Sequence, residues 1–550
     1  MTVERVEIIP LGGCGEIGKN MTVVGLDGEF LLIDAGLSFP TEEMHGVDIV
    51  IPDTTFLRQN KEHLRAIVLT HGHEDHVGAL PYILPEFRVP VYGSLLTIEL
   101  VKRKLSERMP LSDLDLRTFS QGNRITIGNF NFEPIHVTHS LPDSYAIAIH
   151  TPLGAVVFTG DLKLDFTPVD GRLTEISRFG ELGDEGVLLL LSDSTNADTP
   201  GWSPSEKSVV PGFERVFSQA PGRILITTFA TNLHRIQQAL DIANAFGRKV
   251  ALAGRSMEQN FAIARDTKRL RVPKDLMIRL EDCDMYEDHQ IVILTTGAQG
   301  EPLSALNLMS KDEYPRMQIR SGDTVIYSAR PIPGNETAVW QTVNRLFRQG
   351  AWVLYGPEEG QHVSGHAYQE ELKLLINLMR PKAIAPVHGE PRHQYHYCQL
   401  AREMGYTESN LIVLENGNRL VLTRDRIEFA DDVVCGRVLV DSSGYAGVTD
   451  DVLRDRQNLA NDGVVFINVA IDSEAGKIIG TPEIVTRGVV GLDGAILDLQ
   501  DVILSSLQKL SHAELHDTGA VHQEVSDLAR RYFKRTSNKR PLVIASVIDV

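Results

Sequence analysis

The chain has 550 residues, more than one hydrophobic core usually holds, so we expect about two to four domains. Its hydrophobic share of 42% and charged share of 23% are ordinary for a soluble globular protein, and no apolar run approaches the roughly 20 residues that cross a bilayer, so we expect no membrane partner. The formal net charge of −19 opposes polyanionic partners as a whole-molecule property. Residues 248–279 nevertheless hold nine basic and three acidic side chains, which form either a nucleic-acid contact or an ordinary solvated helix face.

The cysteines and the N-terminus bear on the cellular compartment. Residues 3–9 alternate like a strand and show no basic stretch followed by an apolar segment and a cleavage site. We therefore expect a cytoplasmic protein. Wide spacing of the cysteines argues against both a disulfide framework and a cysteine zinc site; they are Cys14, Cys283, Cys398 and Cys435.

Residues 1–207 alternate short apolar segments with Gly, Pro or Asp, which predicts a layered α/β domain. Polar side chains suited to chemistry follow several of these segments directly. Because strand ends present side chains on a shared rim, we expect one site there. The predicted strands are 30–33, 66–69, 146–149, 155–158 and 187–191.

The pattern changes over residues 208–345 to strand, helix, strand units, which is typical of a parallel α/β domain. The first pattern returns over residues 346–430, so we expect one domain interrupted by an insertion. The predicted elements are strands 223–227, 249–253, 290–295 and 324–328 with helix 233–245, then strand 351–355, helix 367–379 and strand 383–387.

The C-terminal region is predicted to be separate. A Gly- and Asp-rich linker covers residues 431–460. Residues 461–550 then form a small α/β domain with a strand at 463–470, a long amphipathic helix within 494–535 and a final strand at 541–550.

The densest chemical signal is the run Thr70-His71-Gly72-His73-Glu74-Asp75-His76, directly after predicted strand 66–69. Alternate positions of an extended segment point the same way, so His71 and His73 can reach one ion together, while Asp75 and His76 face a neighbouring position. Imidazole suits zinc or a similar transition ion, and carboxylates complete the charge and bridge two ions. A surface or pH-sensing histidine cluster is the alternative, but four ligand-type side chains within six residues favour a two-metal site.

Further ligand-type residues stand at later predicted strand ends, namely His139, Asp161 and His388. A single histidine at a strand end is more often a satisfied polar residue than a ligand. Together with the histidine run, however, these residues supply what two metal ions need. The sequence therefore predicts a metal-dependent hydrolase.

These motifs resemble those of the metallo-β-lactamase superfamily, whose fold is an αββα sandwich with a dinuclear site. The resemblance implies two divalent metal ions per subunit, and histidine and carboxylate ligands accept both zinc and manganese. By this resemblance the first ion is held by His71, His73 and His139, the second by Asp75, His76 and His388, Asp161 bridges the two, and Asp34 supports the ligands from behind.

Motifs outside the histidine run narrow the substrate. The insertion, with runs 192–196 and 362–366, resembles the β-CASP nucleases, in whose pattern Asp193, His366 and His388 are marker positions. Runs 12–20, 331–336 and 386–390 look like those of the bacterial ribonuclease J family, and this likeness covers essentially the whole chain. It implies a metallo-β-lactamase sandwich interrupted by a parallel α/β β-CASP domain, followed by a small C-terminal α/β domain.

The resemblance also implies an activity. Members of this family combine 5′-to-3′ exonucleolytic and endonucleolytic cleavage of single-stranded RNA, favour a 5′ monophosphate, and act in mRNA decay and rRNA maturation. Two metal ions generate hydroxide near neutral pH and stabilise the attacking and leaving oxygens of phosphodiester hydrolysis. We expect Asp75 or Asp193 to orient or deprotonate the nucleophile and His366 to donate a hydrogen bond or proton toward the departing 3′ oxygen.

Candidate RNA contacts follow from residue chemistry. Ser364, Gly365 and His366 offer a hydroxyl, approachable backbone amides and an imidazole for a 5′ phosphate, with His362 in the same channel, although such a segment is otherwise an ordinary turn. A planar guanidinium suits phosphate recognition, and a structural salt bridge is its competing use; the candidates are Arg235, Arg255 and Arg330.

Two weaker expectations concern calcium and assembly. The resemblance suggests a calcium ion near Asp48 and Asp441, and a homodimer formed through the C-terminal domain. The alternatives are a DNA-processing β-CASP nuclease, a small-molecule lactonase and a catalytically silent RNA-binding subunit. The insertion and residues 362–366 disfavour the lactonase, and the filled ligand positions disfavour the silent subunit.

Overall fold

Two β-sheets that pack face to face form the centre of the metal-ligand region in a computed structural model, which describes residues 5–41, 43–332, 334–356, 360–441, 447–490 and 495–550. Their facing side chains are fully buried and apolar, for example Ile8 and Leu31 in the first sheet and Val156 and Leu189 in the second. The first sheet has the order β20 (Ile427–Ala430), β19 (Arg419–Thr423), β1 (Arg5–Gly12), β2 (Met21–Leu26), β3 (Glu29–Ile33), β5 (Leu64–Val68), β6 (Val91–Gly93) and β7 (Leu116–Thr118). The second has the order β18 (Ala383–Val387), β12 (Val187–Asp193), β11 (Ala155–Phe158), β10 (Ser144–His150), β9 (Phe130–Val137) and β8 (Ile125–Ile127).

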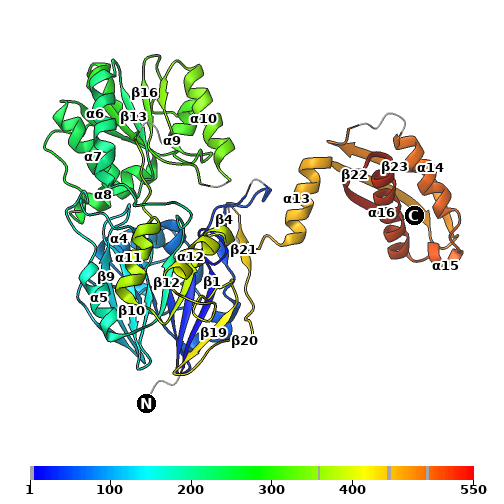
Figure 1. Ribbon diagram of the computed structural model, residues 1–550. Helices are drawn as coiled ribbons and strands as arrows, with labels where there is room; N and C mark the ends of the chain where they lie inside the picture. The colour runs from blue at the N-terminus through cyan, green and yellow to red at the C-terminus, as the bar shows by residue number, and fades with distance from the viewer. Residues whose placement is uncertain (1–4, 42, 333, 357–359, 442–446, 491–494) are drawn as a thin grey trace. The chain divides into compact units, whose positions relative to one another are not determined.

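Helices cover the outer faces of this sandwich. Helices α5 (Ile176–Glu185), α11 (Gln369–Met379) and α12 (Pro391–Glu403) bury their apolar faces on the second sheet (Figure 1). Helix α4 (Leu95–Ser106) contacts β6 and β7 of the first sheet, and the short helices α1 (Thr55–Gln59), α2 (Glu74–Val77) and α3 (Leu80–Ile83) lie between its strands along the chain.

Parallel pairing of β12 with β18 closes the sandwich across the insertion. Leu189 pairs with Ala383 and Asp193 with Val387, so the ends of both strands lie side by side. Both strands are almost entirely buried, as expected for parallel strands covered on two faces. This pairing brings Asp193 next to His388, although nearly two hundred residues separate them.

The insertion is a parallel sheet with helices on both faces, as predicted. Its strand order is β14 (Lys249–Ala253), β15 (Ile291–Thr295), β13 (Ile224–Thr227), β16 (Thr324–Tyr327) and β17 (Trp352–Leu354). Helices α6 (Val210–Gln219), α7 (Leu233–Ala245) and α8 (Arg255–Asp266) pack on one face, and α9 (Ala305–Ser310) and α10 (Glu336–Arg348) pack on the other (Figure 1).

The C-terminal sheet has the order β23 (Lys477–Arg487), β22 (Val464–Asp472) and β24 (Leu542–Asp549). The prediction of one long helix within 494–535 is wrong. Three helices cover one face of this sheet instead: α14 (Ala495–Leu507), α15 (His512–Leu515) and α16 (Thr518–Ser537). Two side chains start new helices there, since Ser511 Oγ accepts from the Glu514 amide and Asp517 accepts from the Gly519 amide.

The chain divides into two compact units, Met1–Ser38 with Val50–Arg437 and Phe39–Ile49 with Val438–Val550. Residues 39–49, expected in the first domain, therefore belong with the C-terminal unit. There Arg456 of α13 (Asp450–Asp462) donates to the carbonyls of His45 and Gly46. Strands β4 (Ile49–Pro52) and β21 (Arg437–Val440) lie where the chain passes between the units. Among the described residues, no helix has the length and apolarity to cross a bilayer.

Candidate metal centre

The predicted ligands lie together at the ends of strands from both sheets. His71 and His73 follow β5, and α2 begins at the next residue, which turns Asp75 and His76 back toward the same point. His139 follows β9, Asp161 follows β11 and His388 follows β18. The structure brings these seven residues together in two groups that share Asp161.

The first group contains His71, His73, His139 and Asp161. Nδ1 of His73 lies 3.0 Å from Nε2 of His71 and 3.2 Å from Nε2 of His139. Oδ2 of Asp161 lies 3.6 Å from Nε2 of His71 and 3.7 Å from Nε2 of His139. Three imidazole nitrogens and one carboxylate oxygen thus converge on a single point, a donor set that suits a transition-metal ion.

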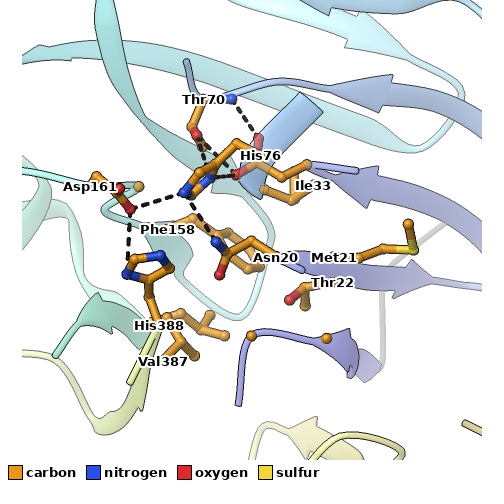
Figure 2. A pocket seen from close by; sticks show the side chains of 15 residues that line it. Asn20, Met21, Thr22, Ile33, Thr70, His76, Phe158, Asp161, Val387 and His388 are labelled. Carbon is orange, nitrogen blue, oxygen red and sulfur yellow. Dashed lines mark hydrogen bonds and ion pairs between the residues drawn. The ribbon is translucent and has the colours of Figure 1, made fainter. Parts of the chain in front are cut away.

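The second group contains Asp75, His76, Asp161 and His388. Nε2 of His76 lies 3.1 Å from Oδ1 of Asp161, and Nε2 of His388 lies 3.0 Å from Oδ2 of Asp75. Figure 2 shows His76, Asp161 and His388 directed toward one another, with the Asn20 amide beside His76. A cavity opens at this group, and its lining includes Gly12, Gly13, Asn20, Thr22, Thr70, His76, Asp161 and His388.

Histidines of the first group are neutral at physiological pH. Burial, with repulsion from His76, holds the pKa of His71 well below its ordinary value. Burial also lowers the pKa of His73 to about 4 and that of His139 to about 3, because the neighbouring carboxylates only partly offset it. Neutral imidazoles are the form that binds metal.

Histidines of the second group have the opposite tendency. Burial disfavours their charged form, but Asp161, Asp75 and Asp34 raise the pKa of His76 well above its ordinary value. Asp161 and hydrogen bonds to Asp193 and Asp75 likewise raise the pKa of His388 to about 10, against the effect of burial. Burial raises the pKa of Asp75 and Asp161, but the adjacent histidines lower both below the ordinary range. The carboxylates here are thus neutralised by positive charge, a role that divalent cations fill equally well.

Asp161 fits the part of a shared ligand. Its side chain is buried, its Oδ2 faces the first group and its Oδ1 faces the second. Within the described part of the chain, Oδ1 accepts no hydrogen bond of good geometry, and its contact is with Nε2 of His76 at 3.1 Å, a position in which a cation can replace the proton. These observations fit a pair of divalent metal ions held by the two groups.

Side chains behind the ligands fix their orientation. Oδ2 of Asp34 lies 2.7 Å from Nδ1 of His76, and Asp34 also accepts from the amide and hydroxyl of Thr70. Thr195 Oγ1 lies 2.7 Å from Nδ1 of His388. Asp34 and His388 both occupy the left-handed region, at φ +59° and +52°, so the fold holds them in a costly conformation.

Sequence reasoning missed Asn20, Thr70 and Thr195 in this supporting layer. Asn20 Nδ2 donates to the Asp75 carbonyl and lies 3.1 Å from Nε2 of His76. Thr70 and Asn20 lie inside motifs that the sequence displays, but small polar residues are too common for their type to reveal a role.

Asp193 and His366 form a third cluster with His388. Nδ1 of His366 lies 2.7 Å from Oδ2 of Asp193, and Nε2 of His366 lies 4.0 Å from Oδ2 of Asp161. The His366 ring stacks on that of His388, with centroids 5.5 Å apart. Its side chain is 19% exposed against 5% for His388, so His366 is the more accessible of the two.

The segment 362–366 lies directly against the first ligand group. The Gly365 carbonyl lies 2.8 Å from Nδ1 of His139, which directs Nε2 of that ring toward the other ligands. A Cβ atom on Gly365 would lie 2.8 Å from atoms of the His139 ring, so only glycine permits this approach. Ser364 Oγ accepts from Asn196 and from the His366 amide, and His362 is half-buried nearby, with its pKa lowered to about 3 chiefly by burial.

The three predicted RNA-binding arginines occupy different environments. Arg235 is fully buried and pairs with Glu206, so in this structure it is unavailable to a solvent-side phosphate. Arg255 is 76% exposed and pairs with Glu107 of the metal-binding domain, and Arg330 is exposed at the end of β16. The salt bridge considered as the competing use is therefore the observed state of Arg235 and Arg255.

Calcium binding at Asp48 and Asp441 stays a prediction. The Asp48 amide donates to the Val440 carbonyl, which places it beside the strand that ends before Asp441. Among described residues, the groups of three or more possible metal ligands are those at the two-group centre and the Asp193 cluster.

Comparisons with known proteins match the whole chain. Four family models align in order: the metallo-β-lactamase superfamily over 14–204, the ribonuclease J β-CASP domain over 221–346, a Zn-dependent metallo-hydrolase RNA specificity domain over 358–412 and the ribonuclease J C-terminal domain over 451–550. They confirm the predicted fold class, a metallo-β-lactamase α/β domain with a β-CASP insertion and a C-terminal domain.

Individual relatives agree with these models. The chain is 44% identical to Ribonuclease J of Synechocystis sp. over 98% of this chain and 86% of that protein. It is 41% identical to Ribonuclease J of Thermus thermophilus over 99% and 96% of the two chains, and 36% identical to Ribonuclease J2 of Bacillus subtilis over 100% and 99%. A crystal structure of a protein of unknown function from Enterococcus faecalis matches with a TM-score of 0.54 and 18% identity, over 76% of this chain and all of that chain, and shows the fold alone.

Replacing the shared carboxylate should remove metal from both groups. We expect the parent to bind two divalent ions per chain and Asp161→Asn to bind less than one, because an amide supplies no charge and only one oxygen. His136→Ala is the control, since buried His136 lies three residues from His139 but contacts the Leu173 carbonyl instead. Elemental analysis of metal-loaded protein measures the difference; two ions in Asp161→Asn would contradict the shared position.

Proposed function

This chain belongs to the ribonuclease J family, and we propose that it is a ribonuclease that holds two divalent metal ions and cleaves RNA phosphodiester bonds both exonucleolytically, from 5′ to 3′, and endonucleolytically. One observation carries the proposal: two ligand groups share Asp161 immediately beside the 362–366 segment, where polar groups face the centre. The RNA specificity domain described for residues 358–412 covers that segment. The proposal includes a role in mRNA decay and rRNA maturation and a cytoplasmic location.

The metal ions, zinc or manganese, would be held by the two groups and would supply charge that activates water and stabilises oxygens on phosphorus. Asp193 keeps His366 in place through the hydrogen bond to Nδ1, so the opposite nitrogen, Nε2, faces the centre. From there it can donate toward the departing 3′ oxygen. Asp75 is 30% exposed beside the second group, so its carboxylate can orient the attacking water.

Residues 364–366 form the proposed seat of a 5′ monophosphate. The amide N–H groups of Ser364 and Gly365 have no acceptor among the described residues, so both can donate to phosphate oxygens. His366 adds an imidazole. Because phosphate contacts carry no base information, weak sequence preference follows.

Two other functions remain as alternatives. A DNA-processing nuclease would use the same centre, and a silent RNA-binding subunit would use the same surface without turnover. The filled ligand positions favour an active enzyme, and matched RNA and DNA substrates with added Mn²⁺, Zn²⁺ or Mg²⁺ separate the three.

Loss of the His366 imidazole should slow cleavage without releasing metal. We expect His366→Ala to reduce the single-turnover rate about 10²- to 10⁴-fold, the range of general acid–base catalysis. His150→Ala is the control, because His150 pairs with Glu133 far from the centre along β10. A near-parental single-turnover rate in metal-replete His366→Ala contradicts the assignment.

The phosphate seat predicts a preference among RNA 5′ ends. Degradation of 5′-monophosphate RNA should exceed that of 5′-hydroxyl or 5′-triphosphate RNA about tenfold, the value of one charge-assisted hydrogen bond. Processive rates on the three end-labelled RNAs measure this. Equal rates on the three RNAs would contradict the proposed phosphate seat. Cleavage of a circular RNA, which has no 5′ end, would report endonucleolysis alone.

We also propose that the chain forms a homodimer through the C-terminal sheet. Helices cover the face that carries Ile467 and Val469, whereas Phe466 and Ile544 pair across the opposite face. There Phe466 is 39% exposed, Ile544 41% and Ile548 52%. An exposed apolar sheet face of this kind is typical of a protein–protein interface.

A charge on this open face should disrupt the dimer. We expect Phe466→Asp to sediment as a monomer at concentrations where the parent is a dimer. Leu497→Asp is the control, because Leu497 is 67% exposed on helix α14, which lies on the covered side of the sheet. A dimeric Phe466→Asp protein, or a monomeric parent, would contradict the proposal.

A further inference from the structure

Three charged side chains are buried together where the insertion joins the metal-binding domain. Glu206 accepts from Lys163 at 3.3 Å through Oε1 and from Arg235 at 2.9 Å through Oε2. Side-chain exposure is 1% for Lys163, 2% for Glu206 and 0% for Arg235. Burying one anion between two cations is costly unless further hydrogen bonds satisfy the remaining donors.

Donors of both cations reach backbone or hydroxyl oxygens as well as Glu206, and two of these bonds reach the segment that precedes His366. Among the described residues, only Arg235 Nε of these two side chains is buried without a partner. Lys163 Nζ donates to the Ser364 carbonyl at 3.1 Å and to the Pro204 carbonyl at 3.1 Å. Arg235 donates to the Gln361 carbonyl at 2.7 Å and to the Ser328 hydroxyl, which itself donates to the Gln361 carbonyl. The two cations therefore hold the segment at two points, three residues apart.

The triad also joins both domains. Lys163 lies two residues after Asp161, and Arg235 lies in helix α7 of the insertion. Glu206 lies where the chain leaves for the insertion, just before α6, and Gln361 lies where it returns. Burial raises the pKa of Glu206, but Lys163 and Arg235 lower it to about 2, so the anion persists at physiological pH.

We propose that the ion triad Lys163–Glu206–Arg235 is a positioning device that fixes residues 361–366 against the metal ligands. The other contacts of the segment lie toward its His366 end: the Gly365 carbonyl contacts His139, Asn196 donates to Ser364 and to the His366 carbonyl, and Asp193 contacts His366. Arg235 and Lys163 hold the carbonyls of Gln361 and Ser364. The amides of Ser364 and Gly365 have no acceptor among the described residues and remain able to donate to a phosphate. Displacement of the insertion would move Arg235, and the phosphate seat with it. The consequence for 5′ ends rests on the function proposed above; the fixing of the segment does not.

Arg235→Lys tests the proposed positioning role while it keeps the positive charge. A lysine keeps the ion pair with Glu206 but cannot also reach Ser328 and the Gln361 carbonyl, because it lacks the second arm of the guanidinium. Glu206→Gln is the harsher variant, since it leaves two buried cations without a counter-ion and can fail to fold.

The insertion offers a matched control in Arg223→Lys. Arg223 is equally buried, pairs with Asp323 through two hydrogen bonds and donates to the Gln318 carbonyl, but none of its partners belongs to residues 361–366. A general loss of stability should affect both lysine variants alike.

Two readouts separate positioning from general stability. In metal-loaded protein, amide hydrogen exchange of residues 360–366 should speed up in Arg235→Lys and stay parental in Arg223→Lys. The ratio of kcat/KM for 5′-monophosphate over 5′-hydroxyl RNA should fall about tenfold in Arg235→Lys only, because the loss of a positioned charge-assisted contact has that size. A smaller active fraction lowers both kcat/KM values and leaves their ratio unchanged.

The outcomes are distinct. Unchanged exchange in Arg235→Lys, or equal acceleration in both variants, overturns the positioning role. Faster exchange in Arg235→Lys with an unchanged ratio overturns its consequence for phosphate recognition. If the parent itself does not discriminate between 5′ ends, the proposed preference for a monophosphate fails, and hydrogen exchange still decides whether the triad holds the segment.

Discussion

A single buried carboxylate, Asp161, is the constraint around which the metal-binding domain is arranged. It lies among five histidines and belongs to both ligand groups, with one oxygen toward each. An ionised carboxylate at this depth needs positive charge, which comes from protonated His76 and His388 or from cations in the two groups. Burial keeps the first-group imidazoles neutral, whereas Asp161 and the neighbouring carboxylates raise the pKa of His76 in the second group so that it takes up a proton.

The second feature of the molecule is that the insertion reaches into this centre. Parallel pairing of β12 with β18 sets Asp193 beside His388, and residues 361–366 pass over the first ligand group. The insertion is therefore more than a covering domain, because the segment that returns from it carries His366 and the proposed phosphate seat. One hydrogen bond, between the Gly365 carbonyl and His139, both orients a metal ligand and holds the segment that is proposed to contact the substrate.

Much of this arrangement could be predicted from sequence, because the signals are local. Apolar strands followed at once by ligand-type residues predict both the layered fold and the position of the site, and the structure brings the predicted ligands together in two groups that share Asp161. Helix α7 and strands β11, β14 and β18 have the predicted bounds. The division of 494–535 into three helices was missed because two polar caps interrupt one amphipathic pattern.

Other features depend on partners that sequence spacing does not connect. The type of residue at Arg235 suggested phosphate binding, but its burial depends on Glu206 and on the Gln361 carbonyl. Residues 39–49 join the C-terminal unit through contacts with Arg456, over four hundred residues away. Such long-range pairs arise from tertiary packing, which overrides local propensity and charge pattern.

Anomalous scattering from crystals of the protein grown with Mn²⁺ or Zn²⁺ tests the central claim most directly. The account predicts two peaks in each chain, one among His71, His73 and His139 and one among Asp75, His76 and His388, with Asp161 in contact with both. A single peak, or two peaks that do not share Asp161, would contradict it.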